Sequence, residues 1–152
     1  MFTYLTKGHR STIYRGTFKG KKVIKKVEHP KVINRIQNEI KYLKVLQPYG
    51  FTPKLYVEDQ NYFIAQYIKG PTIEEFFKDA TKKKIQTVIK QIVLECRVLD
   101  ELHIDKKEMT HPYKHIIISK TPKMIDFERA KFSTYPKNLT SFVQYLQSGK
   151  VK

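Results

Sequence analysis

The stretch HIDKKEMTHPYKHIIISKTPKMIDFERA, residues 103–130, determines how the rest of the chain is interpreted. Two short apolar runs, residues 116–118 and 124–125, flank the sequence Ser-Lys-Thr-Pro-Lys. Proline fixes φ and removes a hydrogen-bond donor, so Lys-Thr-Pro-Lys is typical of a turn. The stretch therefore predicts a small β-hairpin.

Polar residues that a hairpin does not need lie at its two ends. His111, Lys114 and His115 come just before the first strand, and Asp126 and Glu128 follow the second. Extended residues two apart point the same way, so both carboxylates should face the end where His115 enters. Carboxylate oxygens are the ligands that hard cations prefer, so the pattern outlines a cation site.

Composition limits what can surround this hairpin. With 152 residues and 40% apolar content, the chain can form one unit or two small lobes. No apolar run approaches the roughly 18 residues of a membrane span, and the polar N-terminus is not a secretory signal, so we expect a cytoplasmic protein without membrane contact. The single cysteine, Cys96, lies on an apolar helical stripe and should be a buried thiol.

The formal net charge of +16 is spread over both halves of the chain. Diffuse charge of this kind favours binding to polyanions or nucleotides without naming one of them.

Strand and helix patterns fill the rest of the chain. Strands are predicted at residues 2–6, 13–18 and 22–27, followed by a helix at 32–46 and a hairpin at 54–57 and 62–68. These strands should close a five-stranded antiparallel sheet. A capping box at Thr72–Glu75 opens a short helix, and longer helices follow at 82–102 and at 138–147, the latter capped by Asn138.

Together these residues resemble a known family. Ile125-Asp126-Phe127-Glu128 resembles the Asp-Phe-Gly metal motif of protein kinases in the spelling of atypical microbial kinases, and the preceding hairpin resembles their catalytic-loop hairpin. The chain is similar to the small archaeal predicted Ser/Thr protein kinases related to the RIO kinases and to the KEOPS-complex kinase. Loop, lysine, helix glutamate, hinge, hairpin and metal aspartate occur in kinase order.

The resemblance implies an α+β, minimal kinase-like bilobal fold. Residues 1–68 would form an N-lobe with the five-stranded antiparallel sheet and one helix, and residues 69–152 a reduced, mostly helical C-lobe. The sequence ends where the activation segment of a kinase would begin, so we expect a partner protein to complete the C-lobe. The implied cofactors are ATP and Mg²⁺ or Mn²⁺.

In the N-lobe, the resemblance implies that Lys25 holds the α- and β-phosphates of ATP. Glu39 lies inside an apolar helical stripe, where a carboxylate is costly unless paired, so we expect an ion pair with Lys25. A solvated lysine and a glutamate at the stripe's edge are the alternative. The other implied nucleotide-binding residues are Val23 above the adenine, Gly8, Arg10, Ser11, Thr12 and Gly16 in a phosphate loop, and Gln66, Tyr67 and Ile68 in a hinge.

In the C-lobe, His115 takes the place of the metal-binding asparagine and Thr110 the place of the catalytic aspartate. Threonine cannot act as a base near neutral pH, so Glu108 and His111 are the candidate substitutes, and Lys114 would steady the transferred phosphoryl group. Imidazole is a softer ligand than Mg²⁺ prefers, so Asp126 would carry most of the metal binding, helped by His115 and Glu128.

A zinc site built on His111 and His115 is less favoured than the magnesium site. Pro112 between the two histidines disfavours the helix that would align both rings, and no third soft ligand is near.

Three functions remain open from the sequence. The first is an atypical ATP-dependent Ser/Thr kinase that phosphorylates itself or a partner protein. The second is a catalytically defective, nucleotide-binding or regulatory module, and the third is a basic RNA-associated factor.

Tyrosines 14, 62 and 67 are expected in core strands, and no strand face has a clear aromatic and basic alternation. Only weak, salt-sensitive and sequence-indifferent nucleic-acid binding is therefore predicted.

Overall fold

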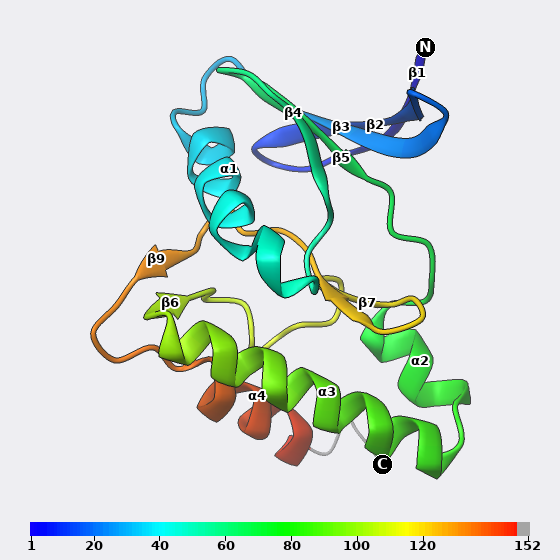
Figure 1. Cartoon of the computed structure of the whole chain (residues 1–152), viewed down its shortest axis with the longest axis vertical. Helices are drawn as coiled ribbons and strands as arrows, with labels where there is room; N and C mark the ends of the chain where they lie inside the picture. Colours follow the sequence, from blue (N-terminus) through cyan, green and yellow to red (C-terminus); the bar gives the residue numbers. More distant parts are fainter. Residues whose placement is uncertain (149–152) are drawn as a thin grey trace. The chain divides into compact units, whose positions relative to one another are not determined.

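Two units make up the computed structural model, which describes residues 1–148 (Figure 1). Unit 1 comprises Met1–Ile68, and unit 2 comprises Lys69–Lys152. The boundary coincides with the predicted boundary between the lobes. That the two units form one kinase-like domain stays a prediction.

Unit 1 contains the five-stranded antiparallel sheet that the sequence predicts. Its strands lie in the order β1-β2-β3-β5-β4. The second connection is a two-residue turn in which Lys19 and Gly20 both have positive φ, of 49° and 76°. Such turns match the twist of a hairpin and favour glycine. The strands are β1 (Phe2–Lys7), β2 (Ser11–Phe18), β3 (Lys21–Glu28), β4 (Leu55–Glu58) and β5 (Tyr62–Gln66).

Helix α1 (Arg35–Leu46) begins three residues later than predicted and continues into the short 3₁₀ helix η1 (Gln47–Tyr49). Asn34 has a left-handed backbone with φ 62° and makes no side-chain cap. Instead, Glu28 Oε1 accepts the N–H groups of Arg35, at 2.6 Å, and of Ile36, at 3.0 Å. A carboxylate there also complements the positive end of the helix dipole. The cap thus comes from the end of β3, a contact that local sequence cannot reveal.

The sheet has two different faces because side chains alternate along each strand. We call the face that packs against α1 the helix face. It includes Ile13, Lys26 and Phe63, which are paired across three strands, and Ile24, two residues before Lys26 on β3. We call the opposite face the aromatic face. Four of its residues form one row across four strands: Tyr4, Tyr14, Lys25 and Ile64. The other residues that we assign to this face are Phe2, Lys7, Phe18, Lys21, Val23, Tyr56 and Tyr62.

Within the described residues, unit 2 contains the three helices that the sequence predicts, together with two small sheets. The capping box is confirmed, with Thr72 as the N-cap and Glu75 bonding back to it. The elements are α2 (Ile73–Asp79), α3 (Lys82–Glu101), β6 (Ile104–Asp105), β7 (Ile116–Ile118), β8 (Pro122–Met124), β9 (Lys131–Phe132) and α4 (Asn138–Gln147).

The predicted hairpin is confirmed as β7 and β8, but its turn is shorter than expected. Ile118 pairs with Pro122, so the turn consists of residues 119–121 and the proline opens the second strand. Proline is tolerated there because the first residue of a strand need not donate to the ladder. The pairing of β6 with β9 was not predicted, since each strand has only two residues.

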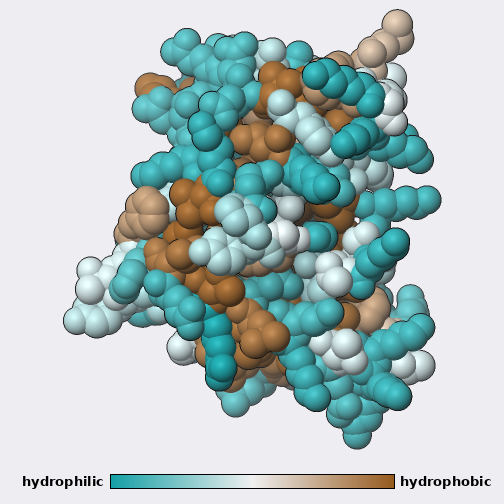
Figure 2. All heavy atoms as spheres, in the orientation of Figure 1, coloured by the Kyte–Doolittle hydropathy of each residue, from teal (hydrophilic) through white to brown (hydrophobic). Residues whose placement is uncertain are grey.

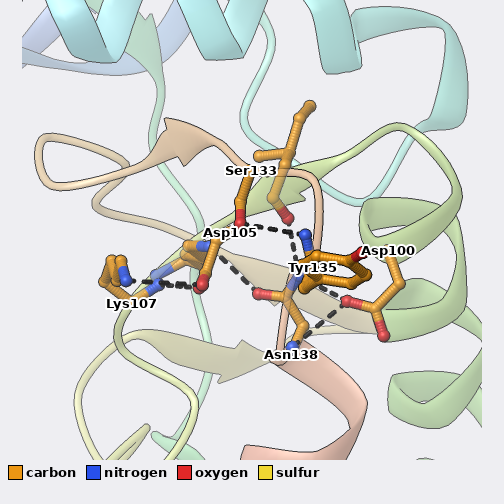
Figure 3. A network of polar contacts seen from close by, with 8 residues as sticks. Asp100, Asp105, Lys107, Ser133, Tyr135 and Asn138 are labelled. Atoms are coloured by element: carbon orange, nitrogen blue, oxygen red, sulfur yellow. Dashed lines mark hydrogen bonds and ion pairs between the residues drawn. The ribbon is translucent and has the colours of Figure 1, made fainter.

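Asn138 does not cap α4, as the sequence suggested. Lys137 is the N-cap residue, and the Asn138 side chain is buried between other elements (Figure 3). Its Nδ2 donates to Asp100 Oδ1 at 2.8 Å and to the Ile104 carbonyl at 2.6 Å, and its Oδ1 accepts from Lys106 N–H at 3.0 Å. This one amide joins α4 to the end of α3, with which α4 packs, and to the chain after β6.

Apolar side chains form the interior of each unit. Ile36, Leu43 and Leu46 are buried in unit 1, and Ile92, Leu99 and Phe142 in unit 2. Cys96 is buried, as predicted. Hydrophilic residues cover much of the face drawn in Figure 2, with smaller hydrophobic areas between them, which agrees with the high net charge.

Within residues 1–148, no helix is both long enough and apolar enough to cross a membrane.

Candidate functional site

A buried ion pair links β3 to α1 on the helix face of unit 1. Lys26 Nζ lies 2.6 Å from Glu39 Oε1, and the two side chains are only 8% and 4% exposed. Burying either charge alone would be costly, because a low-dielectric interior does not replace the lost hydration. The pair therefore explains how Glu39 is tolerated inside the apolar stripe of α1.

The prediction that Lys25 pairs with Glu39 is wrong, and the error is one residue of strand register. Lys25 and Val23 lie on the aromatic face, where Lys25 Nζ sits 4.4 Å from the Tyr62 ring centroid. Ile24 and Lys26 occupy the places that Val23 and Lys25 were expected to fill. A shift of one residue moves a strand side chain to the other face of the sheet.

The predicted phosphate loop begins as a tight turn, and three of its five residues, Ser11, Thr12 and Gly16, already lie in β2. Gly8 N–H donates to the Ser11 carbonyl at 2.9 Å, and the buried Ser11 and its neighbour Thr12 begin the strand. His29 holds the turn in place. Its ring Nε2 lies 3.0 Å from Thr12 Oγ1, and its backbone N–H donates to the Arg10 carbonyl at 2.9 Å. The phosphate-binding role of these residues stays a prediction.

Gly16 has a packing reason to be glycine. A Cβ at this position would lie 2.6 Å from a ring atom of Phe2 on β1. The close approach of that ring excludes any larger residue.

The predicted hinge residues lie at the end of β5. Gln66 N–H donates to the Lys54 carbonyl at 2.8 Å, and Tyr67 N–H donates to the Lys22 carbonyl at 3.1 Å. These two N–H groups are engaged within unit 1 and cannot also donate to an adenine ring. Ile68 is buried. Adenine recognition by this segment stays a prediction, and it would depend on groups other than those two.

In unit 2, His115 lies between two carboxylates. Its Nε2 is 3.4 Å from Asp126 Oδ2, and its Nδ1 is 3.6 Å from Glu108 Oε2. Arg129 Nη1 lies 3.6 Å from the other Glu108 oxygen. We call Glu108, His115, Asp126 and Arg129 the imidazole cluster. The side chains of its members are 16–52% exposed, although the His115 Nδ1 atom itself is shielded from solvent.

The β-hairpin explains why His115 and Asp126 meet. The ladder pairs Ile116 with Met124, and one residue further out the Ile125 N–H donates to the His115 carbonyl at 2.9 Å. The residue before β7 and the residues after β8 are thereby held opposite each other. The sequence predicted this meeting of His115 and Asp126, whereas the contacts of Glu108 and Arg129 emerge from the structure.

Lys106 makes a hydrogen bond to the backbone of Asp126. The lysine is completely buried, its Nζ donates to the Asp126 carbonyl at 3.1 Å, and the ammonium lies 4.9 Å from the Phe127 ring centroid. Lysine is almost never buried to this extent unless its charge is satisfied. Sequence reasoning missed Lys106, as it missed Arg129 and the structural role of Asn138, because no local pattern separates them from the many other polar residues. It also missed Lys26, although the spacing of Val23 and Lys26 was a signal that could have identified this lysine.

The same stretch has an unusual backbone. His103, Lys107 and Asp126 have positive φ values of 58°, 73° and 65°. For residues other than glycine this conformation is uncommon and costs about 1–3 kcal/mol each, so it persists where surrounding contacts enforce it and often at functional sites. The left-handed Asp126 lies in the motif that the sequence singled out.

Four further predicted site residues lie in the same stretch of the chain. Thr110 and Lys114 are exposed, and the exposed His111 ring stacks on Tyr113 with centroids 5.9 Å apart. Glu128 is partly buried. The catalytic or metal-binding roles of these four side chains stay predictions.

In the part of the chain that the structure describes, no three His, Cys, Asp or Glu side chains are arranged to hold a metal ion. The side chain of Asp126 is 29% exposed. Metal binding by Asp126, His115 and Glu128 stays a prediction.

No protein-family model matches the chain, and no curated protein is similar to it at a significant level.

Proposed function

We propose that this protein is an atypical ATP-dependent Ser/Thr kinase, cytoplasmic, that phosphorylates itself or a partner protein. The observation that carries the proposal is the buried Lys26–Glu39 pair between β3 and α1. Val23-Ile24-Lys25-Lys26 has the spacing of the Val-Ala-Ile-Lys strand of protein kinases, with Lys26 in the lysine position. In kinases this lysine pairs with a helix glutamate and meets the phosphates of ATP.

The corrected register also changes the residues that would contact the nucleotide. Ile24, one position above Lys26 on the same face, would pack against the adenine in place of Val23. Arg15 lies on this face as well, paired with Ile24 across the strands, and would add positive charge near the phosphates. Ion-pairing to Glu39 keeps the Lys26 ammonium in one position, which reduces the entropy lost on binding.

The imidazole cluster supports a phosphotransferase in a different way. Bound ATP and Mg²⁺ would supply the phosphoryl group and neutralise its charge, with Asp126 as the metal ligand. Glu108 is the carboxylate placed to accept a hydroxyl proton, and His115 orients both Glu108 and Asp126. His115 then acts as a positioning residue, since each of its ring nitrogens lies beside a carboxylate.

The test compares two adjacent lysines in the full chain. Lys26→Met combined with Glu39→Leu removes the buried pair without leaving a lone charge, and Lys25→Met removes a neighbouring charge from the other face. We expect calorimetry with ATP and Mg²⁺ to show a loss of affinity of about 10- to 100-fold for the double variant, the value of a charge-assisted hydrogen bond, and little change for Lys25→Met. The reverse ranking would overturn the proposal.

Incubation with γ-labelled ATP separates a kinase from a defective nucleotide-binding module. Transfer of label to the chain or to an added protein, lost in Asp126→Asn, supports the kinase. Asparagine also tolerates the left-handed backbone, so this variant changes charge with little strain. Tight ATP binding without any transfer, with and without candidate partner proteins, would favour the module.

A further inference from the structure

The aromatic face of unit 1 brings aromatic and basic side chains next to each other. Tyr4 on β1 pairs with Tyr14 on β2, which pairs with Lys25 on β3. Phe18 pairs with Lys21 where β2 ends and β3 begins. These neighbours come from different strands, so they become visible only when the register of the sheet is known.

Ammonium groups and rings on this face are in direct contact. Lys25 Nζ lies 4.4 Å from the Tyr62 ring centroid and 5.6 Å from that of Phe2. Lys21 Nζ lies 5.5 Å from the Tyr56 ring, whose centroid is 6.3 Å from that of Phe18. Positive charge is therefore held beside the flat surfaces of the rings.

The aromatic face contains buried apolar residues, but its Tyr4 and Tyr14 rings remain accessible to solvent. Val23 and Ile64 on this face are 0% and 7% exposed, whereas Tyr4 is 64% exposed and Tyr14 is partly exposed. Tyr14 and Tyr62 lie in strands β2 and β5, as predicted, but both side chains are only partly buried. Single exposed aromatics are ordinary, but a row of them across adjacent strands is not.

Negative charge is kept away from this face. The five strands contain two acidic residues, Glu28 and Glu58. Glu28 binds the first turn of α1, and Glu58 pairs with Lys44 of α1 at 3.2 Å. Lys7, Lys21 and Lys25 on the aromatic face therefore have no acidic neighbours on that face of the strands.

We propose that the aromatic face binds single-stranded nucleic acid. Unpaired bases stack on Tyr4 and Tyr14, and the phosphates between them meet the ammonium groups of Lys7, Lys21 and Lys25. Exposed aromatics on a sheet with flanking cations are the means by which proteins hold unstacked bases irrespective of sequence. A duplex keeps its bases stacked inside and offers such a platform only its phosphates.

This site is separate from the proposed nucleotide site. Residues of a strand alternate between faces, so Lys25 and Lys26 serve opposite sides of the same sheet. The loss of ATP affinity in the Lys26→Met, Glu39→Leu variant should leave nucleic-acid binding intact. Failure of either proposal is therefore distinguishable from failure of the other.

The experiment is fluorescence anisotropy of the full chain with a labelled oligo-uridylate of about a dozen nucleotides, within the range of known single-strand sites. Tyr4→Ala and Tyr14→Ala should each weaken binding about 5- to 100-fold, and Tyr4→Phe and Tyr14→Phe, which keep the ring, should bind nearly as the parent does. Lys25→Ala should weaken binding and flatten its salt dependence more than Lys22→Ala, the matched lysine on the other face. Thermal melting of each variant checks that the sheet remains folded.

Four results would overturn the inference. The first is equal affinity for a duplex of the same length, and the second is binding that depends on salt but not on Tyr4 or Tyr14. Both would assign binding to diffuse positive charge. The third is competition by poly-glutamate as effective as competition by unlabelled oligo-uridylate, which would assign the face to acidic proteins. Absence of binding at low salt would also refute it.

Discussion

Charges are arranged differently in the two candidate sites. In unit 1, Lys26 and Glu39 meet at 2.6 Å and are less than a tenth exposed. In unit 2, His115 lies 3.4 and 3.6 Å from two carboxylates, and the cluster is a sixth to a half exposed. The first pair is shielded from solvent and at hydrogen-bonding distance, whereas the side chains of the second arrangement are farther apart and partly exposed.

This difference determines how readily the side chains of each arrangement can change partners. A buried ion pair has no water to replace either partner, so its geometry is tied to the packing of β3 against α1. Side chains in a hydrated cluster lose little when they change partners, because water compensates each lost contact. The unit 1 pair is suited to hold a group in place, and the imidazole cluster is suited to accept a substrate or a proton.

The largest effect that tests this contrast is expected from Glu39→Ala. It leaves the Lys26 ammonium buried without its carboxylate, which should lower the free energy of unfolding by about 3–5 kcal/mol. Replacing both residues, Lys26→Met with Glu39→Leu, should recover most of the loss, because a hydrophobic pair often substitutes for a buried ion pair. Urea denaturation at neutral pH measures both, and a loss under about 1 kcal/mol for the single variant would break the contrast.

An effect of intermediate size on stability is expected at Glu95, which carries a buried carboxyl group. Its Oε1 is shielded from solvent without a hydrogen-bond partner. Burial raises the pKa of this carboxyl from 4.5 to about 8, and the positive charge of Lys123 only partly offsets that rise. The folded protein therefore keeps the proton at pH values where the unfolded chain loses it, so stability should fall as pH rises from about 4.5 to 8 and then level off.

Glu95→Gln removes this ionisation while keeping the shape of the side chain. We expect the variant to match the parent near pH 4 and to be more stable at pH 8 by about 1–3 kcal/mol, a range reduced for partial solvent screening. Thermal melting across this pH range measures the difference. Glu101→Gln, an exposed position of the same helix, is the control, and an equal gain there would contradict the assignment.

The smallest effect is expected from Arg129→Ala in the imidazole cluster. The guanidinium is 52% exposed and 3.6 Å from Glu108, so its loss should cost less than about 1 kcal/mol and should matter even less at high salt. Urea denaturation at two salt concentrations measures it. A cost near that of Glu39→Ala would show that the cluster is as tightly coupled as the buried pair.

Much of the secondary structure follows from local physical chemistry. Apolar periodicity predicted the helices, turn residues predicted the hairpins, and the Thr72 capping box is confirmed because all its bonds lie within four residues. The β7–β8 hairpin likewise predicted that His115 and Asp126 would meet. Prediction was less accurate where an element depends on distant residues, as at the start of α1, which Glu28 caps.

The sequence by itself determined the five strands, the antiparallel hairpins and the excess of positive charge, since these depend on composition and on neighbours along the chain. Only the tertiary structure decided which of two adjacent lysines enters the interior, and that Tyr4 and Tyr14 lie in one row with Lys25 across β1, β2 and β3. The physical reason is that strand register is set by packing against α1 and by neighbouring strands. A difference of one residue, invisible in a run of four lysines interrupted by Val23 and Ile24, reverses every side chain in the strand.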